Sequence, residues 1–262
     1  MKISVLSYSF RGLQKAGMMD IFGYLETCKY RYNLQAADLW SGFFPTTDEE
    51  FIDKVKEALV SRDMELADIA VDQAHIWEDD PEDRERHYQR AKRFLEIADK
   101  LGAKFVRIDA GGDRDAPEWT DEQFDFIAER YQEYAQWAYD HGFKVGIENH
   151  WGPEKRWSNL KKMYEAVDHP GFGVSNHLGS WAGPEEEQEK ADELVAPWAS
   201  HTHIAWYIAN GPLLEKLSNL WEAGYDGYYS VEHHSGEDEY TEIGIQIAKV
   251  RDALHKLRTG KA

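Results

Sequence analysis

The chain has 262 residues, of which 42% are hydrophobic and 13% are aromatic. A chain of this length and composition can bury a large core, and it is not of the disordered class. Its formal net charge of −19 argues against nucleic acid as a partner, because nucleic-acid binding needs a basic surface. No stretch approaches the ~20 apolar residues of a membrane span, so no membrane partner is expected. The single cysteine, Cys28, cannot form an internal disulfide, which favours a reducing, cytoplasmic location.

Short apolar runs alternate with longer helical patterns along the chain. The apolar runs predict eight strands, at residues 2–8, 34–40, 64–71, 104–110, 144–149, 172–176, 199–206 and 227–233. Clear helical patterns predict helices at residues 48–62, 81–102, 119–142 and 241–258. Several strands follow a glycine-containing turn, as is typical of the connection from a helix to the next strand.

The alternation of strand and helix predicts βαβ units and therefore a parallel sheet. Eight such units in a chain of ~250 residues predict an α/β protein with a single (β/α)8 TIM barrel, one domain spanning residues 1–262. The competing fold is an open, doubly wound sheet. That fold often begins with a glycine-rich phosphate loop, and the sequence contains neither GxGxxG nor the GxxxxGK motif of phosphate loops.

Polar residues follow the later strands at their C-terminal ends, where the chemistry of a barrel takes place. Glu148, His177, His203 and Glu232 are separated by 29, 26 and 29 residues. These intervals are close to the ~30 residues of one βα unit. Neighbouring strands lie ~4.8 Å apart, so consecutive strand ends can converge on one point. Two carboxylates and two imidazoles there would suit a divalent metal ion.

Each of these residues could instead have a purely structural role. A glutamate at a strand end can pair with a neighbouring arginine or lysine, and a lone histidine in a strand is more often part of the core. At the sixth strand, Ser175 or Asn176 could face inward instead of His177. If His203 points into the barrel, the alternation of side chains requires that His201 does so too, one layer deeper.

Four phrases in the second half of the chain carry a family resemblance: "VGIENHWG", "FGVSNHLGSW", "SHTHIAW" and "YYSVEHH". The chain resembles the sugar isomerase/epimerase superfamily of xylose-isomerase-like TIM barrels, which includes ketose 3-epimerases, inosose dehydratase-like proteins and the endonuclease IV branch. The resemblance implies that Glu148, His203 and Glu232 hold a metal ion. His177 stands where the family usually has an aspartate. A neutral ligand there makes Mn, Fe, Co or Zn more suitable than Mg.

The resemblance implies a metal-dependent isomerase or epimerase that acts on a small-molecule sugar, an unphosphorylated keto sugar or polyol derivative. A proton would move through a metal-stabilised enediolate, with Glu148 and Glu232 as the catalytic bases. The same site could expel a β-substituent, which would make a lyase or dehydratase of an oxidised sugar, a glycoside or an inosose. The third alternative is a non-catalytic barrel subunit or sugar-binding module, because the usual aspartate is missing. Barrels of this type often form homo-oligomers.

Further residues near the strand ends are candidates for contact with the substrate. His75 and His150 could contact its hydroxyl groups, and Arg107 could bind it too. An internal ion pair between Arg107 and Asp109 is the plainer interpretation, since a buried arginine needs an acidic partner. Aromatic rings stack well on sugar C–H faces. The aromatic candidates for contact with the substrate are Tyr8, Trp40, Phe44, Trp77, Trp151, Trp181 and Trp206.

Overall fold

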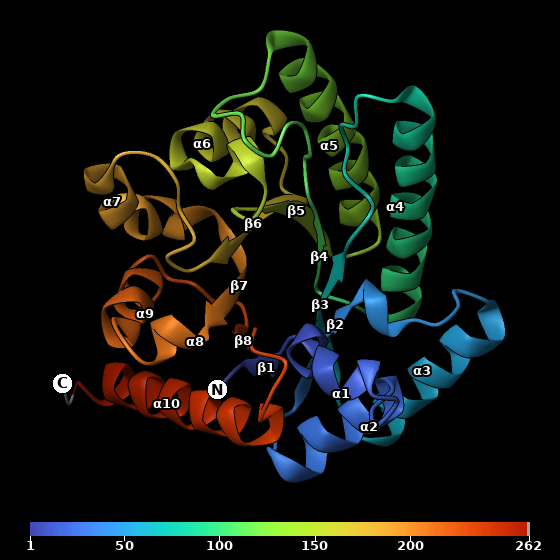
Figure 1. Cartoon of the computed structure of the whole chain (residues 1–262), viewed down its shortest axis with the longest axis vertical. Helices are drawn as coiled ribbons and strands as arrows, with labels where there is room; N and C mark the ends of the chain where they lie inside the picture. The colour runs from blue at the N-terminus through green and yellow to red at the C-terminus, as the bar shows by residue number, and fades with distance from the viewer. Residues whose placement is uncertain (261–262) are drawn as a thin grey trace.

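The computed structural model describes residues 1–260, and in it eight parallel strands surround a common axis (Figure 1). The strands are β1 (Ile3–Val5), β2 (Ala36–Trp40), β3 (Glu65–Val71), β4 (Phe105–Ile108), β5 (Lys144–Glu148), β6 (Phe172–His177), β7 (Ala199–Ala205) and β8 (Tyr229–Glu232). Their order in the sheet is β1-β8-β7-β6-β5-β4-β3-β2. A single bridge from Leu6 to Asp38 joins the two ends of the sheet. The predicted (β/α)8 barrel and all eight predicted strands are therefore confirmed.

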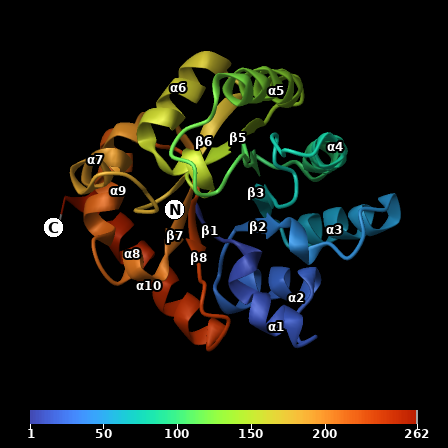
Figure 2. The ribbon, with the colours of Figure 1, turned by 45° about the horizontal axis from the view of Figure 1, so that its top comes forward.

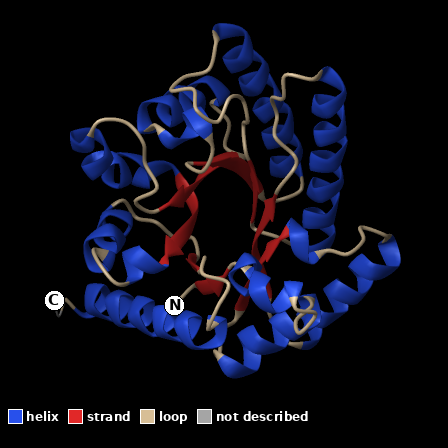
Figure 3. Cartoon of the chain, in the orientation of Figure 1, coloured by secondary structure: helices blue, strands red, loops and turns tan. Residues whose placement is uncertain are grey.

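The helices form an outer ring around the strands (Figures 2 and 3). They are α1 (Arg11–Lys15), α2 (Ile21–Glu26), α3 (Glu49–Ser61), α4 (Pro81–Leu101), α5 (Asp121–Asp140), α6 (Trp157–Val167), α7 (Glu185–Val195), α8 (Trp206–Ala209), α9 (Leu213–Glu222) and α10 (Glu239–Thr259). The four predicted helices correspond to α3, α4, α5 and α10. Their ends carry the expected signals: Gly102 ends α4 in the left-handed conformation, and Thr120 and Gln123 form a capping box that begins α5.

The interior of the barrel is polar, whereas barrel interiors are usually filled by valine, isoleucine and leucine. The register pairs His203 with both His177 and Ser230, and it pairs His201 with Ser175. Paired residues point to the same face of a sheet, and every second residue of a strand does so as well. The inward-facing polar residues are Ser4, Asp38, Asp68, Arg107, Glu148, Ser175, His177, His201, His203, Ser230 and Glu232. The apolar residues between them pack against the helices.

Phe105 closes the barrel below this polar interior. Its ring stacks on His201 with 6.1 Å between ring centroids and an interplanar angle of 14°. Gly146 and Gly173 are register partners beside it. A Cβ atom on Gly146 would lie 1.8 Å from the carbonyl oxygen of Gly173 and 3.0 Å from the Phe105 ring, so a side chain does not fit there. Gly146 in "VGIEN" and Gly173 in "FGVSN" thus leave space for the Phe105 ring.

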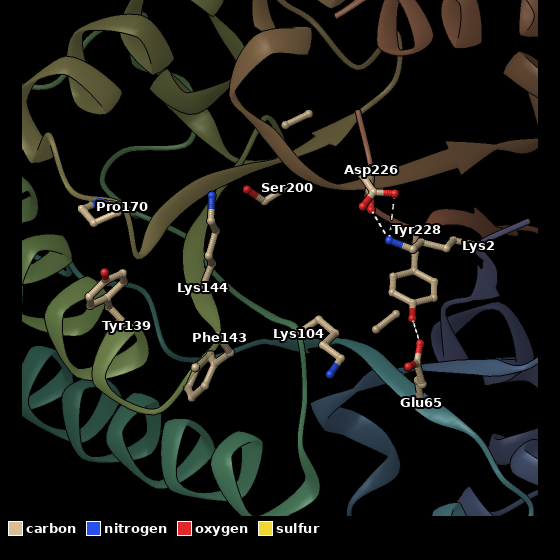
Figure 4. Close-up of a pocket in the computed structure, with 14 residues that line it drawn as sticks. Lys2, Glu65, Lys104, Tyr139, Phe143, Lys144, Pro170, Ser200, Asp226 and Tyr228 are labelled. Carbon is tan, nitrogen blue, oxygen red and sulfur yellow. Dashed lines mark hydrogen bonds and ion pairs between the residues drawn. The ribbon is translucent and has the colours of Figure 1, made fainter. Parts of the chain in front are cut away.

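A cleft of about 620 Å³ opens at the N-terminal ends of the strands, and Lys104, Lys144 and Ser200 are among its lining residues (Figure 4). Barrel enzymes carry their catalytic groups at the C-terminal ends of the strands, so the functional site is sought at the other end. Among residues 1–260, no helix is both long and apolar enough to cross a bilayer.

Candidate metal centre

Four side chains from consecutive strands meet at the C-terminal mouth of the barrel, and we call them the mouth cluster: Glu148 on β5, His177 on β6, His203 on β7 and Glu232 on β8. One candidate ligand atom from each lies within 4.8 Å of the others. The Nδ1 atom of His203 is 2.5 Å from Glu148 Oε1 and 3.7 Å from Glu232 Oε2. The Nδ1 atom of His177 lies 3.5 Å and 3.6 Å from the same two oxygens. Two nitrogens and two oxygens therefore surround one point.

The mouth cluster has the donor set and the unsatisfied atoms that a divalent cation requires. All four residues are buried, with 7% or less of each exposed. His177 Nδ1 and Glu232 Oε2 form no hydrogen bond within residues 1–260. Leaving buried polar atoms without partners is costly, and a cation between them would satisfy both at once. Mixed imidazole and carboxylate ligands suit Mn, Fe, Co and Zn. The residues present thus fit a divalent metal ion.

The second oxygen of Glu148 is held by a buried arginine. Arg107 Nε lies 3.1 Å from Glu148 Oε2, and its other nitrogens lie 2.6 Å from Asp109 and 3.1 Å from Asp72. Burial favours a raised pKa for Glu148, but the charge and hydrogen bond of His203, the neighbouring His177 ring and the charge of Arg107 outweigh it and hold the pKa well below its usual value. Glu148 is therefore a carboxylate at neutral pH, with Oε1 turned to the cluster.

The second oxygen of Glu232 is held by a histidine at the rim. His234 Nε2 lies 3.1 Å from Glu232 Oε1, and nearly half of the His234 side chain is exposed. The His234 ring also stacks on His177, with 5.8 Å between centroids. Its neighbour His233 points the other way and contacts Glu242 of α10 at 2.8 Å. Glu232 thus has a partner that reaches solvent, whereas Glu148 has a partner sealed inside the barrel.

His203 contacts Glu148 of the mouth cluster through Nδ1, and its Nε2 faces the carboxylate of Asp38. Its Nε2 atom lies 4.0 Å from Asp38 Oδ2. Burial alone would lower the pKa of His203, but the charge and hydrogen bond of Glu148, with smaller effects of Glu232 and Asp38, raise it to about 10. A histidine that binds metal is usually oriented by a carboxylate at its second nitrogen; Asp38 faces that nitrogen of His203, at a distance longer than a hydrogen bond.

Asn149, which the sequence analysis did not single out, positions His177. Its side-chain amide donates to the backbone carbonyl of His177 and accepts from the His177 N–H, both at 2.7 Å. Asn149 is fully buried. This pair of bonds fixes the end of β6 against the end of β5. The amide in "VGIENHWG" thus sets the backbone from which His177 reaches the cluster.

Three further predicted residues lie together beside the mouth cluster. His150 is half-exposed, and its Nδ1 lies 3.2 Å from Asp109. Burial favours a lower pKa for His150, but the charge of Asp109 and its hydrogen bond raise the pKa to about 9. The His75 ring packs 4.9 Å from the Trp151 ring, and its Nδ1 contacts Glu78 at 2.9 Å. These groups form one side of the barrel mouth.

The structure spreads the remaining aromatic candidates over three regions. Tyr8 packs edge-on against Trp40 and His234, with centroids at 5.1 and 5.9 Å, which places it at the mouth. Trp181 donates to Asp192 of α7 at 2.7 Å and so anchors the loop after β6. Trp206 packs against His233, on the side facing α10.

Two of the aromatic candidates pack against the helical layer. Phe44 packs against Phe51 and Phe94 in the helical layer. Trp77 packs against Phe126 and the Arg84 side chain between α4 and α5. In both cases an aromatic residue shortly after a strand packs against helix residues.

The chain belongs to the xylose isomerase-like TIM barrel family, whose model matches residues 30–258. The resemblance read from the four phrases is thereby confirmed. No curated protein sequence matches the chain.

Solved structures share the fold at low sequence identity. A xylose isomerase-like TIM barrel protein from Mycobacterium smegmatis in complex with magnesium has a TM-score of 0.78 at 16% identity, covering 100% of this chain and 98% of that one. The 3-keto-D-glucoside 4-epimerase of E. coli has a TM-score of 0.71 at 16% identity, with 99% of each chain covered. A probable 3-DHS dehydratase involved in petrobactin synthesis from Bacillus anthracis has a TM-score of 0.72 at 14% identity, covering 96% and 99%.

Proposed function

We propose that the protein is a divalent-metal-dependent sugar isomerase or epimerase that moves a proton next to a carbonyl group. The observation that carries this proposal is the mouth cluster, in which two carboxylates and two imidazoles meet around unsatisfied atoms. A bound divalent ion would polarise the carbonyl and adjacent hydroxyl of a sugar and so acidify the C–H between them. The family and the epimerases among proteins of the same fold support this reading.

The two glutamates would take and return the proton in this proposal, and their surroundings suit different parts of that task. Glu148 is held as a carboxylate by Arg107, which stays charged at any relevant pH. Glu232 contacts His234, whose half-exposed ring lies at the solvent side of the mouth. Burial favours a raised pKa for Glu232, but His177, His203 and His234 outweigh it and hold that pKa below its usual value, so we assign Glu232 as a carboxylate base on the side of the site nearer solvent. Glu148 then serves as a fixed negative charge and base on the other side.

The groups at the mouth favour an uncharged substrate. Arg107 already faces three carboxylates, so it is not free to bind an anion. Tyr8 and Trp151 supply aromatic surface, and His75, His150 and His234 supply polar ring nitrogens. Such a mixture suits the alternating C–H and O–H groups of a sugar. We therefore propose an unphosphorylated keto sugar or polyol derivative as the substrate class.

Product analysis tests the proposal against elimination, which the fold also supports through its similarity to a dehydratase. Purified protein reconstituted with Mn²⁺ or Co²⁺ is incubated with a panel of keto sugars and 3-keto glycosides. We expect a stereoisomer of equal mass, with activity lost in EDTA and restored by the metal. A product lighter by one water would assign the protein as a dehydratase. Activity unchanged by EDTA would remove the metal from the mechanism.

Replacing His177 with aspartate restores the residue usual in the family and tests whether His177 is a ligand. We expect His177→Asp to keep metal binding and to shift metal preference towards Mg²⁺ or Mn²⁺, because an anionic oxygen replaces a neutral nitrogen. Competition binding with Mg²⁺, Mn²⁺ and Zn²⁺ measures the shift. His169→Asp, on the loop before β6, is the matched control and should change no preference. Identical preferences in His177→Asp and the wild type would exclude His177 as a ligand.

A further inference from the structure

A second group of potential ligands lies one layer below the mouth cluster. We call Asp38 on β2, Asp68 on β3 and His201 on β7 the deep cluster. All three side chains are fully buried, and their candidate ligand atoms lie within 4.8 Å of one another. Asp38 and Asp68 are register partners on neighbouring strands, so their carboxylates lie side by side. The Phe105 ring below His201 closes this layer from beneath.

Several buried polar atoms of the deep cluster lack hydrogen-bond partners, although Asp38 Oδ2 contacts His201 and Ser230. Neither oxygen of Asp68 has a hydrogen bond within the described residues, and Oδ1 of Asp38 and Nδ1 of His201 have none either. Burying a carboxyl group without any partner costs several kcal/mol. Arg107, the interior cation, is already shared by Asp72, Asp109 and Glu148. Asp38 has histidine partners in His201 and His203, but Asp68 has no hydrogen bond or ion pair among the described residues, and a cation beside it would supply one.

The deep cluster repeats the arrangement of the mouth cluster. In each, one imidazole nitrogen contacts one carboxylate oxygen: His203 lies 2.5 Å from Glu148, and His201 lies 2.8 Å from Asp38. In each, a second carboxylate oxygen faces the same space without a hydrogen bond. His203 belongs to both layers, since its Nδ1 faces Glu148 and its Nε2 faces Asp38.

We propose that Asp38, Asp68 and His201 form a second divalent-cation site inside the barrel, beneath the mouth cluster. Two carboxylates and a divalent cation balance in charge, and a neutral His201 completes the donor set. One nitrogen and two carboxylate groups suit Mn²⁺, Co²⁺ or Zn²⁺. Ser230 contacts Asp38 through its hydroxyl group and orients that carboxylate. The cation holds Asp38 in place behind His203 and so stiffens the metal ligand above it.

Metal stoichiometry tests this inference separately from the proposed function. Metal-stripped full-length protein is dialysed against Co²⁺, and cobalt per chain is measured by elemental analysis. We expect two equivalents in the wild type, one in Asp68→Asn and one in Glu232→Gln. Asp226→Asn, at an exposed surface carboxylate, is the control and should retain two. Loss of metal in Glu232→Gln alone, from a wild type that holds only one, would uphold the mouth site and overturn the deep one.

A second measurement needs no variant. Anomalous scattering at the cobalt edge from wild-type crystals should give two peaks, one of them between Asp38, Asp68 and His201 at ~2.0–2.2 Å from its ligands. A peak at the mouth alone, with water or a protonated Asp68 below it, would refute the second site. So would an unchanged cobalt content in a folded Asp68→Asn protein.

Discussion

Replacing Glu148 with glutamine is expected to reduce turnover by at least ~10³-fold while the protein stays folded. A positioned general base contributes about 10²- to 10⁴-fold, and Glu148→Gln also removes an anionic ligand from the mouth cluster. The glutamine keeps the size of the side chain, so the contacts of β5 with β6 remain. Single-turnover rates with saturating metal and sugar, together with circular dichroism, measure the two parts of this prediction.

Glu222→Gln is the matched control, because Glu222 is an exposed glutamate at the end of α9. It carries the same chemical change and should leave turnover unaltered. A folded Glu148→Gln protein with wild-type turnover would end the assignment of Glu148 as base and ligand. Loss of turnover with the metal content unchanged would separate the two roles and leave Glu148 as a base only.

Replacing Arg107 with methionine is expected to destabilise the metal-free protein by about 3–5 kcal/mol, the range for breaking a buried ion pair. The substitution leaves the buried carboxylates of Asp109 and Glu148 without their shared cation. Methionine preserves most of the side-chain volume, so the loss reflects charge more than packing. Urea unfolding of the metal-free protein at pH 7 measures the free energy.

Arg86→Met provides the comparison for Arg107→Met. Arg86 pairs with Asp83 on the surface of α4, where such pairs contribute about 0–1 kcal/mol. If Arg107→Met costs no more than Arg86→Met, Arg107 does not neutralise the interior. A pH profile adds a check, because protonating the orphaned carboxylates should recover part of the lost stability in acid.

The fold and the mouth cluster were predictable because each depends on a local, repeated pattern. Glycine turns and apolar runs recur with the period of a βα unit, and the barrel follows from counting those units. The four mouth residues end their strands one unit apart, so their convergence follows from the same period. His201 was placed one layer below His203 by the alternation of side chains alone.

The deep polar layer was not predicted, although a signal for it exists in the sequence. Asp38 in "AADLW" and Asp68 in "LADIAV" are single acidic residues between apolar neighbours. Both runs were predicted as strands, but no role was predicted for either aspartate. The alternation of inward and outward side chains, applied to both strands together, would have placed the carboxylates of Asp38 and Asp68 inside the barrel.

Other features depend on contacts that no local pattern encodes. Asn149 bonds to the backbone of His177 across two strands, and that pairing depends on the register of β5 and β6. The roles of Trp181 and Trp77 depend on where the loops turn after leaving the barrel. The contacts of Trp181 with Asp192 and of Trp77 with Phe126 join residues from different elements, so no local pattern in the sequence predicts them.

Deuterium exchange into a keto sugar tests the central claim most directly. The metal-loaded protein is incubated in D₂O with each sugar of the panel, and proton NMR follows the C–H next to the carbonyl. The account predicts that this signal disappears with at least one sugar, that EDTA prevents the loss, and that Glu148→Gln shows none. Retention of the C–H signal with every sugar, by a protein that demonstrably holds metal at the mouth cluster, would contradict proton transfer at this site.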